Sequence, residues 1–158
     1  MGERHISEAI FWKIVEIIGW GKSTDHQKLG EKLLYFVKNV NEIDTLTRIA
    51  IQKRETLKDV INAYRKTYND LPHYWGGDDS FWDFRAHIVG LGEETYNKCL
   101  LDIKNISVAK DYKENFEYLF RRATIFAETD EGKELLKLPL DVKELMYDRK
   151  YKLERILK

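Results

Sequence analysis

The chain has 158 residues, the usual size of one domain and long enough to bury a core without a disulfide or a metal. Its 27 basic side chains balance 27 acidic ones, so it lacks the cationic surplus with which proteins bind duplex nucleic acid. Cys99 is the single cysteine, which excludes an intramolecular disulfide, and no long apolar run suggests export or a membrane span. We therefore predict one cytoplasmic domain over residues 1–158, with neither nucleic acid nor membrane as a partner.

Helical periodicity begins near the N-terminus. The first helix is expected to start after Ser7, a good N-cap, and to stop at Gly19. Ser23 or Thr24 is expected to cap a second helix. The apolar residues of that helix fall on one face: Leu29, Leu33, Phe36, Val37 and Val40.

Residues 42–68 continue the helical spacing, but polar residues interrupt it near residues 53–56. This pattern predicts two helices, or one helix with a break at that point. The next segment, residues 69–77, is predicted not to be helical, because its proline and paired glycines favour turns and interrupt helices.

Capping-box patterns predict the starts of three helices in the second half of the chain. Ser80 with Asp83 opens the first, which is expected to run to Gly90 or Gly92 and to bury Phe81, Phe84, Ile88 and Leu91. A short helix through Tyr96, Leu100 and Leu101 follows it.

Asp111 with Glu114 opens the next helix, which carries Phe116, Leu119, Phe120, Ala123 and Phe126. A short turn through Leu135 and Leu136 ends at Pro139. Asp141 with Glu144 opens the last helix, whose apolar residues are Val142, Leu145, Met146, Leu153 and Ile156. Its cations are interpreted as a solvated face: Lys143, Arg149, Lys150, Lys152, Arg155 and Lys158.

No alternating strand pattern, hairpin turn or repeat appears between these segments. The fold class predicted from the sequence is therefore all-α, a compact single-domain bundle of about eight helices.

The segment richest in side chains that could bind a ligand or take part in catalysis spans residues 74–85. Helical spacing places Asp79, Asp83 and His87 on one face, where two carboxylates and an imidazole could hold Mg²⁺. The favoured alternative is that these aspartates cap free N–H groups and complement the helix dipole. A second ligand-rich segment is lacking, so we predict no metal site and no cofactor.

Cys99 is the only thiol that could act as a nucleophile. It lies in a short amphipathic segment, where a small buried side chain is the favoured role. No family signature of a catalytic cysteine, nucleophile elbow or P-loop surrounds it or occurs elsewhere. We predict no catalytic residue and favour a non-enzymatic protein.

One segment resembles a known family. Phe81-Trp82-Asp83-Phe84-Arg85 follows Asp78-Asp79 and precedes a Gly92-x-x-x-Tyr96 element, and Phe11-Trp12 opens the first helix. Over about residues 8–102 this pattern resembles bacterial proteins grouped as the domain of unknown function 4240 family. The resemblance implies a helical core over those residues and no established activity, and about residues 110–158 are expected to form a C-terminal helical extension that it does not cover.

The preferred hypothesis for function is binding of another protein, with homo-oligomerisation left open. The candidate surface comprises His73, Tyr74, Trp75, Asp78, Asp79, Asp83, Arg85 and His87. Aromatic side chains in a non-helical segment are typical of binding loops on a rigid scaffold. Size and neutrality suggest an immunity, antitoxin or anti-defence factor of bacteria or phages. The alternative is an enzyme or a small-ligand or magnesium-binding protein with its site around residues 73–87.

Overall fold

Eight helices make up most of the chain that the computed structural model describes, namely residues 5–20, 22, 25–67, 78–102, 105 and 115–157. Side chains are described within these ranges except at residues 64–67, 78–81 and 152–157. The helices are α1 (Glu8–Ile18), α2 (His26–Leu33), α3 (Val40–Thr67), α4 (Asp78–Gly90), α5 (Glu93–Leu101), α6 (Tyr118–Ala127), α7 (Asp130–Lys137) and α8 (Leu140–Leu157). No strand occurs in this described part, which confirms the all-α prediction.

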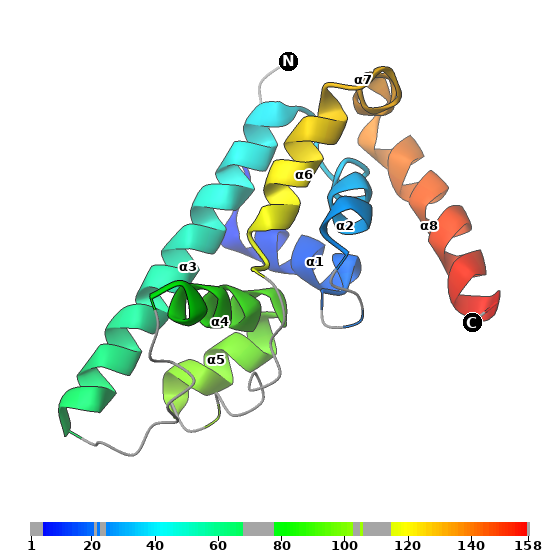
Figure 1. Cartoon of the computed structure of the whole chain (residues 1–158). Helices are drawn as coiled ribbons and strands as arrows, with labels where there is room; N and C mark the ends of the chain where they lie inside the picture. The colour runs from blue at the N-terminus through cyan, green and yellow to red at the C-terminus, as the bar shows by residue number, and fades with distance from the viewer. Residues whose placement is uncertain are drawn as a thin grey trace.

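The helices pack around α3 and α6. Figure 1 shows α3 as the long helix along one side of the molecule, with α4 and α6 against it and α8 at the opposite edge. Helices α2 and α6 approach each other closely at Gly30. A Cβ atom at Gly30 would lie 2.7 Å from the backbone nitrogen of Ala123, so only glycine permits this approach.

The first helix forms as its capping residues predict. The Ser7 hydroxyl accepts the N–H of Ile10 at 3.2 Å, and Gly19 ends the helix in the left-handed region at φ 74°. Its buried residues are Phe11, Trp12, Ile14, Val15 and Ile18.

The predicted bounds of the second helix are wrong. Asp25 caps α2 and accepts the Lys28 N–H at 3.1 Å, and the helix ends at Leu33. Phe36 and Val37 therefore lie in the connection to α3, although both are buried as expected. The next helix begins at Val40, where the Asn39 side chain accepts the N–H of Glu42 at 3.1 Å.

Three further predictions are corrected. Helix α3 runs unbroken through residues 53–56. Helix α4 begins at Asp78, two residues before Ser80, so Ser80 and Asp83 do not form the capping box that was predicted. The predicted turn through Leu135 and Leu136 is a helix, α7, capped by the hydroxyl of Thr129. The pattern at Asp111 and Glu114 lies outside the described residues.

Helix α8 turns the opposite face inward from the one predicted. Lys143, Tyr147 and Tyr151 are buried, whereas Val142, Leu145 and Met146 are 40%, 61% and 40% exposed. The Lys143 ammonium donates to the backbone carbonyls of Leu34, at 2.8 Å, and of Val37. The interpretation of Lys143 as part of a solvated face is therefore wrong.

Aromatic rings complete this attachment of α8. The ring of Tyr147 lies 4.7 Å from that of Phe36 and 5.6 Å from that of Tyr35. The Tyr147 hydroxyl donates to the carbonyl of Ile17 at 3.2 Å. The inner face of α8 thus packs on the α2–α3 connection and reaches the end of α1. None of the helices in the described ranges is both long and apolar enough to span a membrane.

Candidate binding surface

Arg54 occupies a core-facing position of α3. The buried residues along this face recur every three or four positions, as one side of a helix requires: Ile43, Leu46, Ala50, Arg54, Leu57 and Ile61. A guanidinium in this series must find partners for its charge, because an unpaired buried charge is very costly. The polar residues 53–56, which suggested a helix break, therefore belong to a continuous helix that places Arg54 among the buried residues of α3.

The partners of Arg54 come from its own helix and from the start of α6. Its Nε donates to Glu117 Oε2 at 2.5 Å, and its Nη1 donates to Glu55 Oε1 at 2.7 Å. The Trp82 ring lies over the guanidinium at 4.4 Å. Burial raises the pKa of the Glu117 carboxyl, and this rise is opposed by Arg54 and by a hydrogen bond with Trp82.

Arg85 joins α4 to the same group. Its Nη1 donates to the Arg54 carbonyl at 3.3 Å and lies 3.7 Å from Glu55 Oε1. Burial lowers the pKa of the Arg85 guanidinium, and the Glu55 carboxylate opposes that change. Two arginines and two glutamates from α3, α4 and the start of α6 therefore form one ionic group.

Asn115 links this group to α2. Its Nδ2 donates to Asp83 Oδ1 at 2.9 Å, and its Oδ1 accepts the N–H of Glu117 at 2.9 Å. The Asn115 carbonyl lies 2.8 Å from Nε2 of His26, which donates because a carbonyl only accepts. We refer to Arg54, Glu55, Asp83, Arg85, Asn115 and Glu117 as the polar network.

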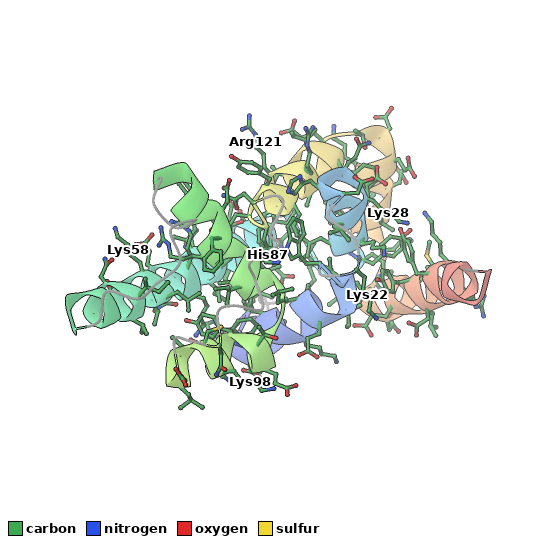
Figure 2. All side chains as sticks on the ribbon, turned by 60° about the horizontal axis from the view of Figure 1, so that its bottom comes forward. Lys22, Lys28, Lys58, His87, Lys98 and Arg121 are labelled. Atoms are coloured by element: carbon green, nitrogen blue, oxygen red, sulfur yellow. The ribbon has the colours of Figure 1, made fainter. Side chains whose placement is uncertain are left out.

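His87 lies apart from the polar network, one helical turn beyond Asp83. Its Nδ1 accepts the indole N–H of Trp20 at 2.9 Å, and burial lowers the pKa of its imidazole. Figure 2 shows His87 in the middle of the molecule, whereas Lys58, Lys98 and Arg121 lie at the periphery. This environment favours a neutral histidine that helps to hold Trp20 in the core.

The predicted Asp79–Asp83–His87 constellation is only partly described. Asp83 faces Asn115 and His87 faces Trp20, so these two side chains have different partners. Asp78 and Asp79 belong to the first turn of α4, and their side chains lie outside the described set, as do His73, Tyr74 and Trp75 entirely. Among the side chains described, no three or more His, Cys, Asp or Glu residues group as metal ligands.

Two aromatic side chains reach the surface beside the polar network. Trp82 is 42% exposed and Tyr118 is 53% exposed. Trp82 bonds to Glu117, the residue before Tyr118, and the Tyr118 ring packs edge-on against His26 with centroids 5.6 Å apart. We refer to Trp82 and Tyr118 as the aromatic pair. The aromatic pair lies beside charged side chains of α3, α4 and the start of α6 that are paired with one another.

Sequence patterns located part of this surface. Asp83, Arg85 and His87 were selected because they cluster on one helix, but eight contributors were not: Trp20, His26, Arg54, Glu55, Trp82, Asn115, Glu117 and Tyr118. The polar interruption at residues 53–56 was the sequence feature that could have identified Arg54. Cys99 is buried, as expected for a structural thiol, and burial raises its pKa to about 11.

No family model, curated protein or solved structure matches the chain. The resemblance of residues 8–102 to the domain of unknown function 4240 family therefore stays a prediction.

Proposed function

We propose that this chain is a small, non-enzymatic helical protein that binds another protein through the aromatic pair and the polar network beneath it. The observation that carries the proposal is the exposure of Trp82 and Tyr118 beside side chains whose charges are paired with one another. Trp, Tyr and Arg dominate the binding energy of protein interfaces, and Trp and Tyr bury a large area at little cost in conformational entropy.

The pairing within the polar network supports binding rather than catalysis. Glu117 faces Arg54, Glu55 faces both arginines, and Asp83 faces Asn115. These bonds fix the geometry of the groups, and a general acid or base would need access to a substrate proton. The sequence predicts that His73, Tyr74 and Trp75 also belong to the binding surface, and these residues lie outside the described part of the chain.

The biological setting that we propose is conflict between bacteria and phages, in which the partner would be a toxin or a defence protein. The small size and balanced charge of the chain support this setting. The alternative, a magnesium or small-ligand site around residues 73–87, gains no support from Asp83 and His87, which face different partners.

The experiment compares partner capture by the wild-type chain and by a Trp82→Ala/Tyr118→Ala variant, with quantitative mass spectrometry as the readout. Ile125→Ala is the matched control, since Ile125 is a similarly exposed apolar side chain on α6. The proposal expects one protein that the wild type and the control retain and that the double variant loses by roughly tenfold or more.

Purified partner then gives the dissociation constant by calorimetry. Circular dichroism must show the double variant folded, because Trp82 also packs on Arg54 within the polar network. A partner that binds the double variant as tightly as the wild type would contradict the proposed surface. Magnesium binding by the wild type that is lost in Asp83→Asn would instead favour the alternative function.

A further inference from the structure

The outer face of α8 is apolar over residues 142–146, and the exposed Arg149 follows on the same face. Val142, Leu145 and Met146 are spaced as neighbours on one side of a helix, and all three are exposed. The inner face is already used, because Lys143, Tyr147 and Tyr151 pack on the α2–α3 connection. An apolar stripe with polar residues on either side of it marks an interaction surface.

Charge is distributed unevenly along the same helix. Its N-terminal half carries Asp141, Glu144 and Asp148, and the only cation there, Lys143, is buried. Its C-terminal half carries the cations Arg149, Lys150, Lys152 and Arg155, against the single acid Glu154. Along the sequence of α8 the charge thus changes from negative to positive near the middle of the helix.

We propose that the outer face of α8 binds the α8 helix of a second copy of this chain in antiparallel orientation. Symmetric dimers bury the same surface on both partners, so the face must be complementary to itself. Antiparallel pairing places the acidic half of each helix beside the basic half of the other. Parallel pairing would place like charges together, which is unfavourable.

The position of α8 permits this pairing. Figure 1 shows α8 at the edge of the molecule, and its outer apolar residues are exposed. This face is different from the aromatic pair on α4 and α6, so dimerisation and partner binding are separate properties. An interface one helix wide is small, and we expect a dissociation constant on the order of micromolar.

Sedimentation equilibrium of the full chain over a range of concentrations measures the dimer. The wild type is expected to dimerise, and Leu145→Glu is expected to raise the dissociation constant by roughly tenfold or more. Ile125→Glu on α6 is the matched control, because it places the same charge at another exposed apolar side chain. Leu145 is 61% exposed, so its variant is expected to stay folded, which circular dichroism checks.

A charge exchange tests complementarity. Asp141→Lys/Glu144→Lys/Asp148→Lys makes α8 basic along its length, and Arg149→Glu/Lys150→Glu/Lys152→Glu/Arg155→Glu makes it acidic. Each variant alone is expected to be monomeric, and an equimolar mixture is expected to form heterodimers. A mixture that stays monomeric while each variant remains folded would overturn the proposal.

Orientation is measured with a spin label on Asp141→Cys. The native thiol is buried with a pKa of about 11, so at neutral pH the label reacts selectively with the exposed position. Antiparallel pairing predicts labels on the order of 25 Å apart, and parallel pairing predicts about 10 Å.

Three further results overturn the proposal: the short distance, a dimer unaffected by Leu145→Glu, or a chain that stays monomeric at roughly 300 μM. A monomer that binds vesicles of anionic phospholipid through Leu145 would assign the face to a lipid surface. A chain that binds neither vesicles nor a second copy of itself would overturn the proposal and would assign the outer face of α8 to a different protein.

Discussion

The indole N–H of Trp20 donates to Nδ1 of His87 at 2.9 Å, across 67 positions of sequence. An indole nitrogen is only a donor, so this bond requires a lone pair on Nδ1 and hence a proton on Nε2 of a neutral ring. Protonation of His87 would bring two N–H groups face to face in the core. The bond therefore links the protonation state of one histidine to the packing of α1, α2 and α6.

We predict that acid weakens the fold through His87. Burial lowers the pKa of His87 below its ordinary value of 6.5, so below that pH the unfolded chain takes up a proton that the folded chain does not. The free energy of unfolding should fall as the pH drops from about 6.5 toward the folded pKa, by at most about 1.4 kcal/mol per pH unit. Urea denaturation across this range measures it. His87→Gln, which keeps an acceptor, is the comparison, and an equal pH dependence in both chains would contradict the prediction.

Gly90→Ala is predicted to destabilise the protein although alanine is the better helix former. The added Cβ would lie 2.5 Å from Cδ2 of Phe116 and 2.6 Å from Cδ1 of Trp20, both in fully buried rings. Overpacking of this kind costs about 1–3 kcal/mol, against about 1 kcal/mol gained from helix propensity. Chemical denaturation gives the sign, with Asn97→Ala on the exposed side of α5 as a control that should change little.

Arg85→Ala is predicted to lower the free energy of unfolding by about 1–3 kcal/mol, because it leaves the Arg54 carbonyl and part of the Glu55 charge without this donor. Arg121→Ala, at the exposed surface of α6, should stay within about 0.5 kcal/mol of wild type. Urea denaturation separates the two variants. Unchanged stability together with lost partner binding would place Arg85 in the interface instead.

Lys143→Met is predicted to loosen α8 while leaving the rest of the helices in place. The methionine fills the space of the lysine stem but cannot donate to the carbonyls of Leu34 and Val37, at a cost of about 1–3 kcal/mol. Hydrogen exchange should quicken in α8 more than in α3. Lys133→Met, at an exposed position of α7, removes the same charge and should leave the exchange of α8 as in wild type.

Dialysis against EDTA is predicted to leave the melting temperature unchanged. The described side chains group no three metal ligands, and the four histidines and one cysteine of the sequence are not spaced as neighbouring ligands of a closed zinc site. The same melting curve should be obtained after adding magnesium back. A fall of several degrees on dialysis would instead point to the aspartates of α4 as a cation site.

Local patterns predicted the helices well, because caps and apolar spacing are properties of neighbouring residues. Ser7 and Gly19 bound α1 as expected, whereas Asp25 was overlooked in favour of Ser23 or Thr24. The break predicted near residues 53–56 was wrong because the sequence does not show that Arg54 finds Glu117, 63 positions away. In the sequence, an arginine that is buried beside a distant carboxylate gives the same polar pattern as an exposed break between two helices.

The orientation of α8 was unpredictable for a related reason. An apolar stripe of Val142, Leu145 and Met146 normally faces the core, but the helix turns Lys143, Tyr147 and Tyr151 inward because the α2–α3 connection offers carbonyls and aromatic rings. For the candidate surface, the sequence identified Asp83, Arg85 and His87 on α4. It could not identify Trp20, Asn115 and Glu117, which folding brings to them from other segments.

The bond from Lys143 to Leu34 has a consequence for synthesis of the chain. The carbonyls at the end of α2 leave the ribosome 109 and 106 residues before the ammonium group that will occupy them. Until α8 emerges, water must solvate Leu34 and Val37, and the rings of Tyr35 and Phe36 lack the tyrosine that later packs on them. The turn between α2 and α3 is thus among the first parts of the fold to be translated and among the last to be completed. A nascent chain that stalls before α8 presents this turn, open and aromatic, to the chaperones around it.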